Sequence, residues 1–148
     1  MLLRSPAFHD REAIPRKYGY RADNVSPPLD IVEVPPGTES LALVMDDPDA
    51  VKPAGKVWDH WVLWNMDPDT GSIPEGSPPP GSKEGMTDYG EMGYGGPDPP
   101  DGVHSYRFRL FALDTRLDLP ESATGDDLER AMEGHVIEKA GLYGTYAP

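Results

Sequence analysis

Proline and glycine constrain the fold of this chain most strongly, because they interrupt helices and strands along its whole length. The sequence holds 18 prolines and 16 glycines among 148 residues, nearly twice the average combined share of about 12%. Proline lacks a backbone N–H and disrupts helix interiors, so long helices have little room to form. Since 37% of the residues are hydrophobic, a core can still be built. The composition predicts many short elements joined by rigid turns and argues against a helical bundle.

The charge balance is strongly acidic, with 26 Asp and Glu against 13 Lys and Arg and a net charge of −13. Nucleic acids and anionic membranes are polyanions that such a surface repels, so we expect neither as a partner. The first 21 residues differ from the rest, because basic residues outnumber acidic ones there. The acidic remainder predicts a well-solvated surface, and adaptation to a halophilic host is the alternative interpretation.

Cysteine is missing from the sequence, which excludes disulfides, thiolate metal sites and cysteine nucleophiles. Arg4 and Pro6 interrupt the first residues before the apolar core of a signal peptide could form. The longest apolar runs, residues 41–45 and 61–64, are far shorter than a membrane span. Nothing with linker composition divides the chain. We therefore expect one domain over residues 1–148, cytoplasmic and without membrane insertion, as a monomer or homodimer.

Three segments have the pattern of β-strands. Residues 41–45 form an apolar run that Asp46-Asp47-Pro48 ends, and residues 105–113 alternate between apolar and polar side chains. Residues 58–66 place one set of side chains on one face and a second set on the other; the sets are His60, Val62, Trp64 and Met66, and Trp61, Leu63 and Asn65. Because both faces are apolar beyond His60, we predict that this strand is buried between layers. Residues 32–35 are expected to form a short edge strand.

One helix is predicted near the C-terminus. Thr124 is a suitable N-cap, and acidic residues follow it where the helix dipole favours anions. Apolar residues then recur on one face as far as Ala140, with His135 among them, and Gly141 is the expected end. Residues 67–102 are rich in turn residues and are long for a loop. We expect them to be a functional loop or to contain short strands.

Side chains that can carry chemistry lie at the ends of the three predicted strands. Asp47 and Asp49 follow the first strand, and His60 lies near the start of the second. His104 and Tyr106 share one face at the start of the third. A carboxylate next to an imidazole fixes its tautomer and can keep it protonated near neutral pH. These residues therefore predict a small anion receptor that uses neither lysine nor arginine.

The loop before the third strand contains Gly95-Gly96-Pro97. Such a loop can aim backbone N–H groups at an anion, an arrangement called a nest. Simpler interpretations exist for each feature: a structural histidine at a strand end, a turn at Asp47-Pro48-Asp49, and an ordinary loop at Gly95-Gly96-Pro97. Composition and spacing alone leave these alternatives open.

A hydrolase is the second class of function to consider. His60 and His104 could act as acid and base with Asp47 nearby, but no Ser or Cys lies in a nucleophile-elbow pattern, so water would have to be activated. The same three residues have the ligand types of a site with two histidines and one carboxylate. We predict neither catalysis nor a bound metal or cofactor, and keep the hydrolase as the alternative.

Eight motifs occur in a characteristic order and spacing. They are NVSPPL at 24–29, VPPGT at 34–38, DPDA at 47–50, WDHWV at 58–62, GPDPP at 96–100, GVHSY at 102–106, GH at 134–135 and GTY at 144–146. In this arrangement the chain resembles the phosphatidylethanolamine-binding protein (PEBP) family, which includes Raf kinase inhibitor proteins, plant flowering regulators and short bacterial and archaeal members. The resemblance extends over most of the sequence.

The resemblance implies a mainly β fold, a sandwich of two antiparallel sheets with a few short helices, including one near the C-terminus. It also implies a non-enzymatic protein that binds small anions such as phosphate, phosphorylethanolamine or acetate, with a kinase or protease that it inhibits as a possible partner. The binding residues carried over by motif are Asp47, His60, Gly96, Pro97, Asp98, His104 and Tyr106, with Asp49 and Trp58 in support.

Three positions depart from the family pattern. Val51 stands where a proline is common, Asp98 where many prokaryotic members have cysteine, and Ser105 where many members have arginine. We expect Asp98 to weaken phosphate binding unless it is paired or turned to solvent. The serine at position 105 removes a donor that often braces the neighbouring loops.

Overall fold

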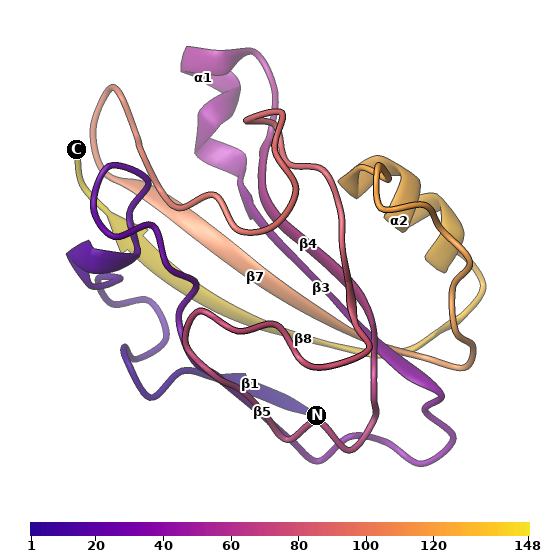
Figure 1. The fold of residues 1–148 in the computed structure, drawn as a ribbon. Helices are drawn as coiled ribbons and strands as arrows, with labels where there is room; N and C mark the ends of the chain where they lie inside the picture. Colours follow the sequence, from indigo (N-terminus) through magenta and orange to yellow (C-terminus); the bar gives the residue numbers. More distant parts are fainter.

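A computed structural model describes residues 1–148 as two antiparallel β-sheets and two short helices (Figure 1). The smaller sheet has the order β1-β2-β5 and the larger the order β6-β4-β3-β7-β8. The strands are β1 (Leu2–Arg4), β2 (Leu29–Val32), β3 (Ser40–Asp47), β4 (Trp58–Met66), β5 (Ser72–Ile73), β6 (Lys83–Glu84), β7 (His104–Leu113) and β8 (Val136–Tyr146). The helices are α1 (Val51–Ala54) and α2 (Gly125–Met132), with 3-10 turns η1 (Arg16–Tyr18) and η2 (Pro48–Ala50). The predicted mainly β sandwich is confirmed.

The central strands β3 and β4 of the larger sheet are buried on both faces along most of their length, as their sequence pattern requires. On β3, alternate side chains point to opposite faces, so Leu43 and Met45 enter the core between the sheets while Val44 packs beneath α2. Leu29, Ile31 and Ile73 of the smaller sheet complete the first core, and Leu128 and Met132 of α2 complete the second. Figure 1 shows α2 and the smaller sheet on opposite sides of the larger sheet.

Strand β4 has the predicted bounds, but its alternation is interrupted twice. Met45 pairs with Trp61 and Asp46 with Asp59, so His60 is an extra residue in a β-bulge. The bulge turns His60 toward Tyr106, on the side of Trp61 rather than that of Val62. At the other end, Asn65 has a φ of 56°, and Met66 lies in the same core as Trp61 and Leu63. The predicted shared face for His60, Val62, Trp64 and Met66 is therefore wrong.

The prediction of a helix reaching residue 140 is also wrong. Thr124 caps α2 as predicted, but the helix ends at Met132, and Gly134 turns the chain with a φ of 79°. From Val136 onward the chain pairs along β7 as strand β8, because β7 would otherwise leave its edge N–H and C=O groups without partners. His135 is exposed and lies 2.8 Å from Asp114 (Nδ1 to Oδ1), outside the core.

The turn-rich segment 67–102 contains the short strands β5 and β6, which was one of the two expected outcomes. The short edge strand predicted at residues 32–35 lies instead at 29–32, as β2, and it is the middle strand of the smaller sheet rather than an edge. The N-terminal segment runs along the outer edge of β8, where Ile14 N–H donates to Thr145 O at 2.8 Å. No helix is long and apolar enough to cross a membrane.

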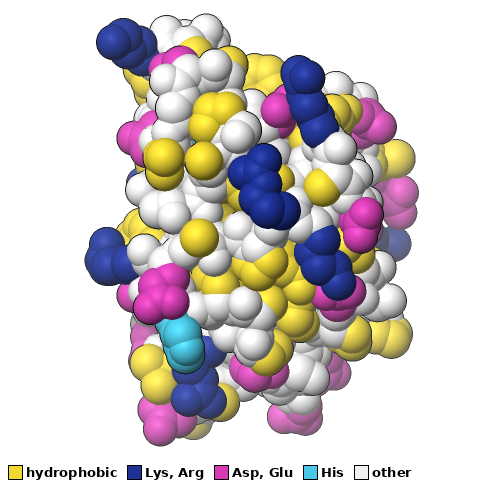
Figure 2. Space-filling model, turned by 90° about the vertical axis from the view of Figure 1, so that its left-hand side faces the viewer, with side chains coloured by type: hydrophobic (Ala, Val, Ile, Leu, Met, Phe, Trp, Pro, Cys, Tyr) yellow, Lys and Arg dark blue, Asp and Glu magenta, His cyan; other side chains and the backbone are white.

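Basic residues of the N-terminal segment do not merge into one surface. Figure 2 shows the side of the molecule that lies on the left in Figure 1, and its Lys and Arg side chains are separated by hydrophobic, acidic and uncharged surface. Lys17 pairs with Glu75 at 3.0 Å, and Arg21 pairs with Asp98 at 3.0 Å. The local excess of positive charge is therefore partly neutralised by acidic side chains from distant parts of the chain.

Candidate functional site

The candidate site is a cavity at one end of the larger sheet. In an antiparallel sheet the end of one strand lies beside the starts of its neighbours, so the end of β3 meets the starts of β4 and β7. The cavity has a volume of about 170 Å³. Its lining includes five predicted binding residues and one predicted supporting residue, namely Asp47, His60, Asp98, His104, Tyr106 and Trp58. Ala50 of η2, Pro53 and Ala54 of α1, and Pro99 and Pro100 supply apolar walls.

His104 is held between two carboxylates. Its Nδ1 lies 2.5 Å from Asp47 Oδ2, and its Nε2 lies 2.6 Å from Asp101 Oδ1. Burial lowers the pKa of His104, but the hydrogen bonds and charges of Asp47 and Asp101 outweigh it and raise the pKa above its ordinary value. Both nitrogens donate only when the ring is protonated. The two carboxylates therefore favour the protonated ring, and neither of its N–H groups is free for a ligand.

His60 is in the opposite state. The side chain is almost fully buried, and its Nδ1 lies 2.7 Å from Gly95 O. That carbonyl can only accept, so Nδ1 carries a hydrogen and Nε2 has no hydrogen in the neutral ring. Burial is the main reason that the pKa of His60 is lowered. His60 is therefore a neutral imidazole near pH 7, with Nε2 as its remaining polar atom.

Tyr106 lines the cavity and has a hydroxyl without a hydrogen-bond partner. The alternation of β7 puts Tyr106 on the core face with Phe108 and Leu110. The side chain is fully buried, and its Oη has no hydrogen-bond partner. Burial, followed by the charge of Asp47, raises the pKa of Tyr106 well above its ordinary value, so the group is a neutral O–H donor. A buried donor without an acceptor costs about 1–3 kcal/mol, and an acceptor inside the cavity would remove that cost.

The expected nest of backbone N–H groups is wrong for Gly95-Gly96-Pro97. Gly95 N–H donates to His60 O at 2.8 Å, Gly96 N–H donates to Asn24 Oδ1 at 2.7 Å, and proline has no N–H. Neither Gly96 nor Pro97 lines the cavity.

The same loop supports the site through its carbonyl groups. Gly95 O orients His60, and Gly96 O accepts from the hydroxyl of Tyr89 at 2.8 Å. Glycine is required at position 96, since a Cβ there would lie 2.0 Å from Tyr18 O. The loop therefore positions side chains that line the cavity.

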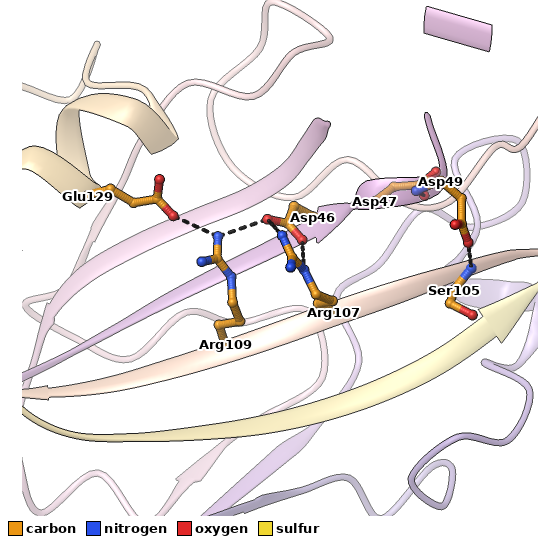
Figure 3. Close-up of polar contacts among 7 residues, drawn as sticks. All are labelled: Asp46, Asp47, Asp49, Ser105, Arg107, Arg109 and Glu129. Carbon is orange, nitrogen blue, oxygen red and sulfur yellow. Dashed lines mark hydrogen bonds and ion pairs between the residues drawn. The ribbon is translucent and has the colours of Figure 1, made fainter. Parts of the chain in front are cut away.

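Asp49 lies where the predicted supporting role requires. Its Oδ2 accepts from Ser105 N–H at 2.9 Å, and its own N–H donates to Asp47 Oδ1 at 2.9 Å (Figure 3). This chain of contacts ties the end of β3 to the start of β7. Trp58 lines the cavity and packs edge-on against Tyr89, with ring centroids 5.6 Å apart. Val51, one of the departures, is exposed on α1.

Asp98 is paired with an arginine and also lines the cavity. Its Oδ2 accepts from Arg21 Nε at 3.0 Å, and its side chain is 31% exposed. The pairing expected from the sequence is thus present.

Sequence reasoning missed two residues that matter to the site. Tyr89 lines the cavity and packs against His60 with ring centroids 5.6 Å apart, but it lies in an irregular loop whose path no periodicity predicts. Asp101 binds His104 from three residues earlier in the chain. A carboxylate so near a candidate histidine was a signal that could have found it.

The alternative metal site is not assembled. Both nitrogens of His104 are bonded to carboxylates, and no group of three His, Cys, Asp or Glu is arranged to hold a metal ion. The donor set of Asp47, His60 and His104 therefore does not fit a metal in this geometry.

Comparisons with known proteins agree with the architecture and the motifs. The family model described as phosphatidylethanolamine-binding protein matches residues 4–147. A UPF0098 protein from Methanothermobacter thermautotrophicus is 49% identical, covering 99% of this chain and 98% of the relative. A UPF0098 protein from Pyrococcus abyssi is 43% identical over 99% of this chain and 85% of the relative. The chain belongs to the phosphatidylethanolamine-binding protein family.

Solved structures show the same fold. A putative phosphatidylethanolamine-binding protein homolog from Chlamydia trachomatis has a TM-score of 0.92 and 38% identity, covering 98% of this chain and 95% of that one. Escherichia coli YbcL, described as a new member of the mammalian PEBP family, has a TM-score of 0.91 and 28% identity, covering 98% and 96%. The family resemblance and the sandwich fold predicted from the sequence are both confirmed.

Proposed function

We propose that this protein is a non-enzymatic binding protein whose cavity takes the acidic end of a small molecule, such as a carboxylate or a phosphate group. The proposal is carried by Tyr106, which lines the cavity and has a buried hydroxyl with no acceptor. An acid oxygen is an acceptor that would satisfy it. The volume of about 170 Å³ suits such a group with a short attachment.

His60 supplies the second contact of the proposed site. In its neutral form Nε2 can only accept, so it contacts an acid oxygen favourably only when that oxygen or the ring carries a proton. Ligand binding is then coupled to uptake of one proton at His60 or on the ligand. Because the pKa of His60 is lowered, affinity is expected to rise as the pH falls from 8 to 6.

Hydrolysis by a pair of histidines has less support from the geometry. An acid–base pair needs one nitrogen of each ring directed at the substrate or its water, and His104 uses both nitrogens on Asp47 and Asp101. The family resemblance also implies inhibition of a kinase or protease. That role stays a prediction, which assays against kinase and protease panels would check.

Replacement of Tyr106 tests the proposal. Calorimetric titration with acetate and with phosphate at pH 6 should give saturable binding to the natural protein. Tyr106→Phe should weaken it by about 10-fold or more, because a hydrogen bond to a charged group is worth about 1.5–3 kcal/mol. The same variant should be at least as stable without ligand, since it removes an unsatisfied hydroxyl.

Tyr143→Phe is the matched control, because Tyr143 lies on β8 outside the cavity. It should leave affinity unchanged. Equal affinities for the natural protein and Tyr106→Phe would overturn the proposal, as would no binding of either anion.

A further inference from the structure

The charges around the cavity are unusual for a site that takes an acid. No lysine or arginine lines it, whereas Asp47, Asp98 and the imidazole of His104 do. The cation on His104 lies between Asp47 and Asp101, each within 2.6 Å, so these two carboxylates already offset it. Asp98 adds a further negative charge at the cavity wall.

Arg21 neutralises Asp98 only in part. The side chain of Arg21 is 85% exposed and contacts one carboxylate oxygen, Oδ2, through Nε. Water strongly screens ion pairs between such exposed groups, which therefore contribute little to stability. The other oxygen of Asp98 has no hydrogen-bond partner among the described contacts. A ligand in the cavity therefore experiences a net negative potential from this side.

We propose that Asp98 makes the cavity select singly charged acids, such as carboxylates and phosphodiesters, over doubly charged phosphate monoesters. This inference rests on the proposed binding of an acidic group. Coulomb energy is proportional to the net charge that binding adds to the cavity. Uptake of one proton leaves a bound monoanion with no net charge and a bound dianion with one negative charge, so Asp98 weakens binding of the dianion more. Through its charge, Asp98 can thus discriminate between phosphodiesters and phosphate monoesters without contacting the ligand.

Two small phosphates provide the test. Dimethyl phosphate carries one negative charge at pH 8, whereas methyl phosphate carries two there, because a phosphate monoester loses its second proton near pH 6. Asp98→Asn removes the charge and keeps the shape of the side chain. We expect it to strengthen methyl phosphate binding about 3-fold at pH 8 and dimethyl phosphate binding by less. At pH 5, where methyl phosphate is a monoanion, the two gains should be equal.

Asp118→Asn is the matched control, since Asp118 is exposed, lies away from the cavity and has no described partner. It changes the net charge by the same amount and should alter neither affinity by more than measurement error. Asp98→Ser serves as a second variant if Asp98→Asn lowers the melting temperature.

Equal gains for both phosphates at pH 8, or no gain for either, would overturn the inference while leaving the proposed function intact. If neither phosphate bound the natural protein, Asp98→Asn or Asp98→Ser, the proposed function itself would fail. A larger gain for methyl phosphate, confined to high pH, would support the inference.

Discussion

Asp46 and Asp47 are neighbours at the end of β3, both almost fully buried, with side chains on opposite faces of the larger sheet. On the side of α2, Asp46 accepts from Arg107 at 2.7 and 3.0 Å and from Arg109 at 2.8 Å (Figure 3). Arg109 also reaches Glu129 of α2 at 2.8 Å. Asp46 thus ties three elements together with groups that never lose their charge at physiological pH.

Asp47 has a different set of partners. It contacts an imidazole, which can lose its proton, and a backbone N–H, and it also borders a cavity. The comparison teaches that burial of a carboxylate does not by itself mark a binding site. Asp47 differs from Asp46 in having a partner that titrates, the imidazole of His104, and in lining a cavity. On these grounds we assign a structural role to Asp46, whereas a role of Asp47 in binding stays a prediction.

The largest effect is expected from Asp46→Asn, which would leave two arginines without their shared carboxylate. Breaking a buried ion pair from one side costs about 3–5 kcal/mol, and we expect about 3 kcal/mol because both arginines are about 30% exposed. Urea unfolding would measure the loss. Glu129→Gln, which changes a more exposed partner of Arg109, should cost less than about 1 kcal/mol. Equal losses for the two variants would contradict the structural role of Asp46.

Asp47→Asn should have a smaller and pH-dependent effect on stability. The pKa of His104 is raised in the folded protein, so its stabilising contribution is complete below its unfolded pKa of about 6.5 and is lost as the pH rises through the folded pKa. The difference in unfolding free energy between the natural protein and the variant should therefore be largest below pH 6.5 and shrink above it. A difference that grew with pH would contradict the assigned protonation of His104.

Asp49→Ala should have the smallest effect of the three. It removes the acceptor for the N–H of Ser105, an exposed contact, and we expect a stability loss below about 1 kcal/mol. Affinity for acetate should fall by about 3-fold, because the link between the ends of β3 and β7 is weakened while the cavity side chains are kept. An affinity loss of about 10-fold or more, as expected for Tyr106→Phe, would mean that Asp49 contacts the ligand itself.

The central strands could be predicted from the sequence because each has a local signal, a continuous apolar run in β3 and alternating side chains in β7. The pattern of residues 58–66 predicted β4 to the residue. Strand β8 could not be predicted in this way, since the spacing of Val136 and Ala140 also fits a helix. Hydrogen bonding to β7, between residues far apart in the sequence, makes this segment a strand.

The candidate site was predictable in part for the same reason. The convergence of Asp47, His60, His104 and Tyr106 at one sheet end follows from antiparallel order. The orientation of His60 depends on a bulge against β3, and the role of Gly95 and Gly96 depends on partners in distant segments. No local pattern encodes such contacts.

The central claim is that an acid oxygen binds between Tyr106 and His60 while His104 stays occupied by its carboxylates. Histidine nitrogen NMR spectra, recorded at pH 7 during a titration with acetate, test this claim most directly. The account predicts that the Nε2 signal of His60 moves from the position of a bare nitrogen toward that of a protonated or hydrogen-bonded one, while the His104 signals stay at imidazolium positions. Signals of His60 that do not move at saturating acetate, or a titration that shifts His104 instead, would contradict it.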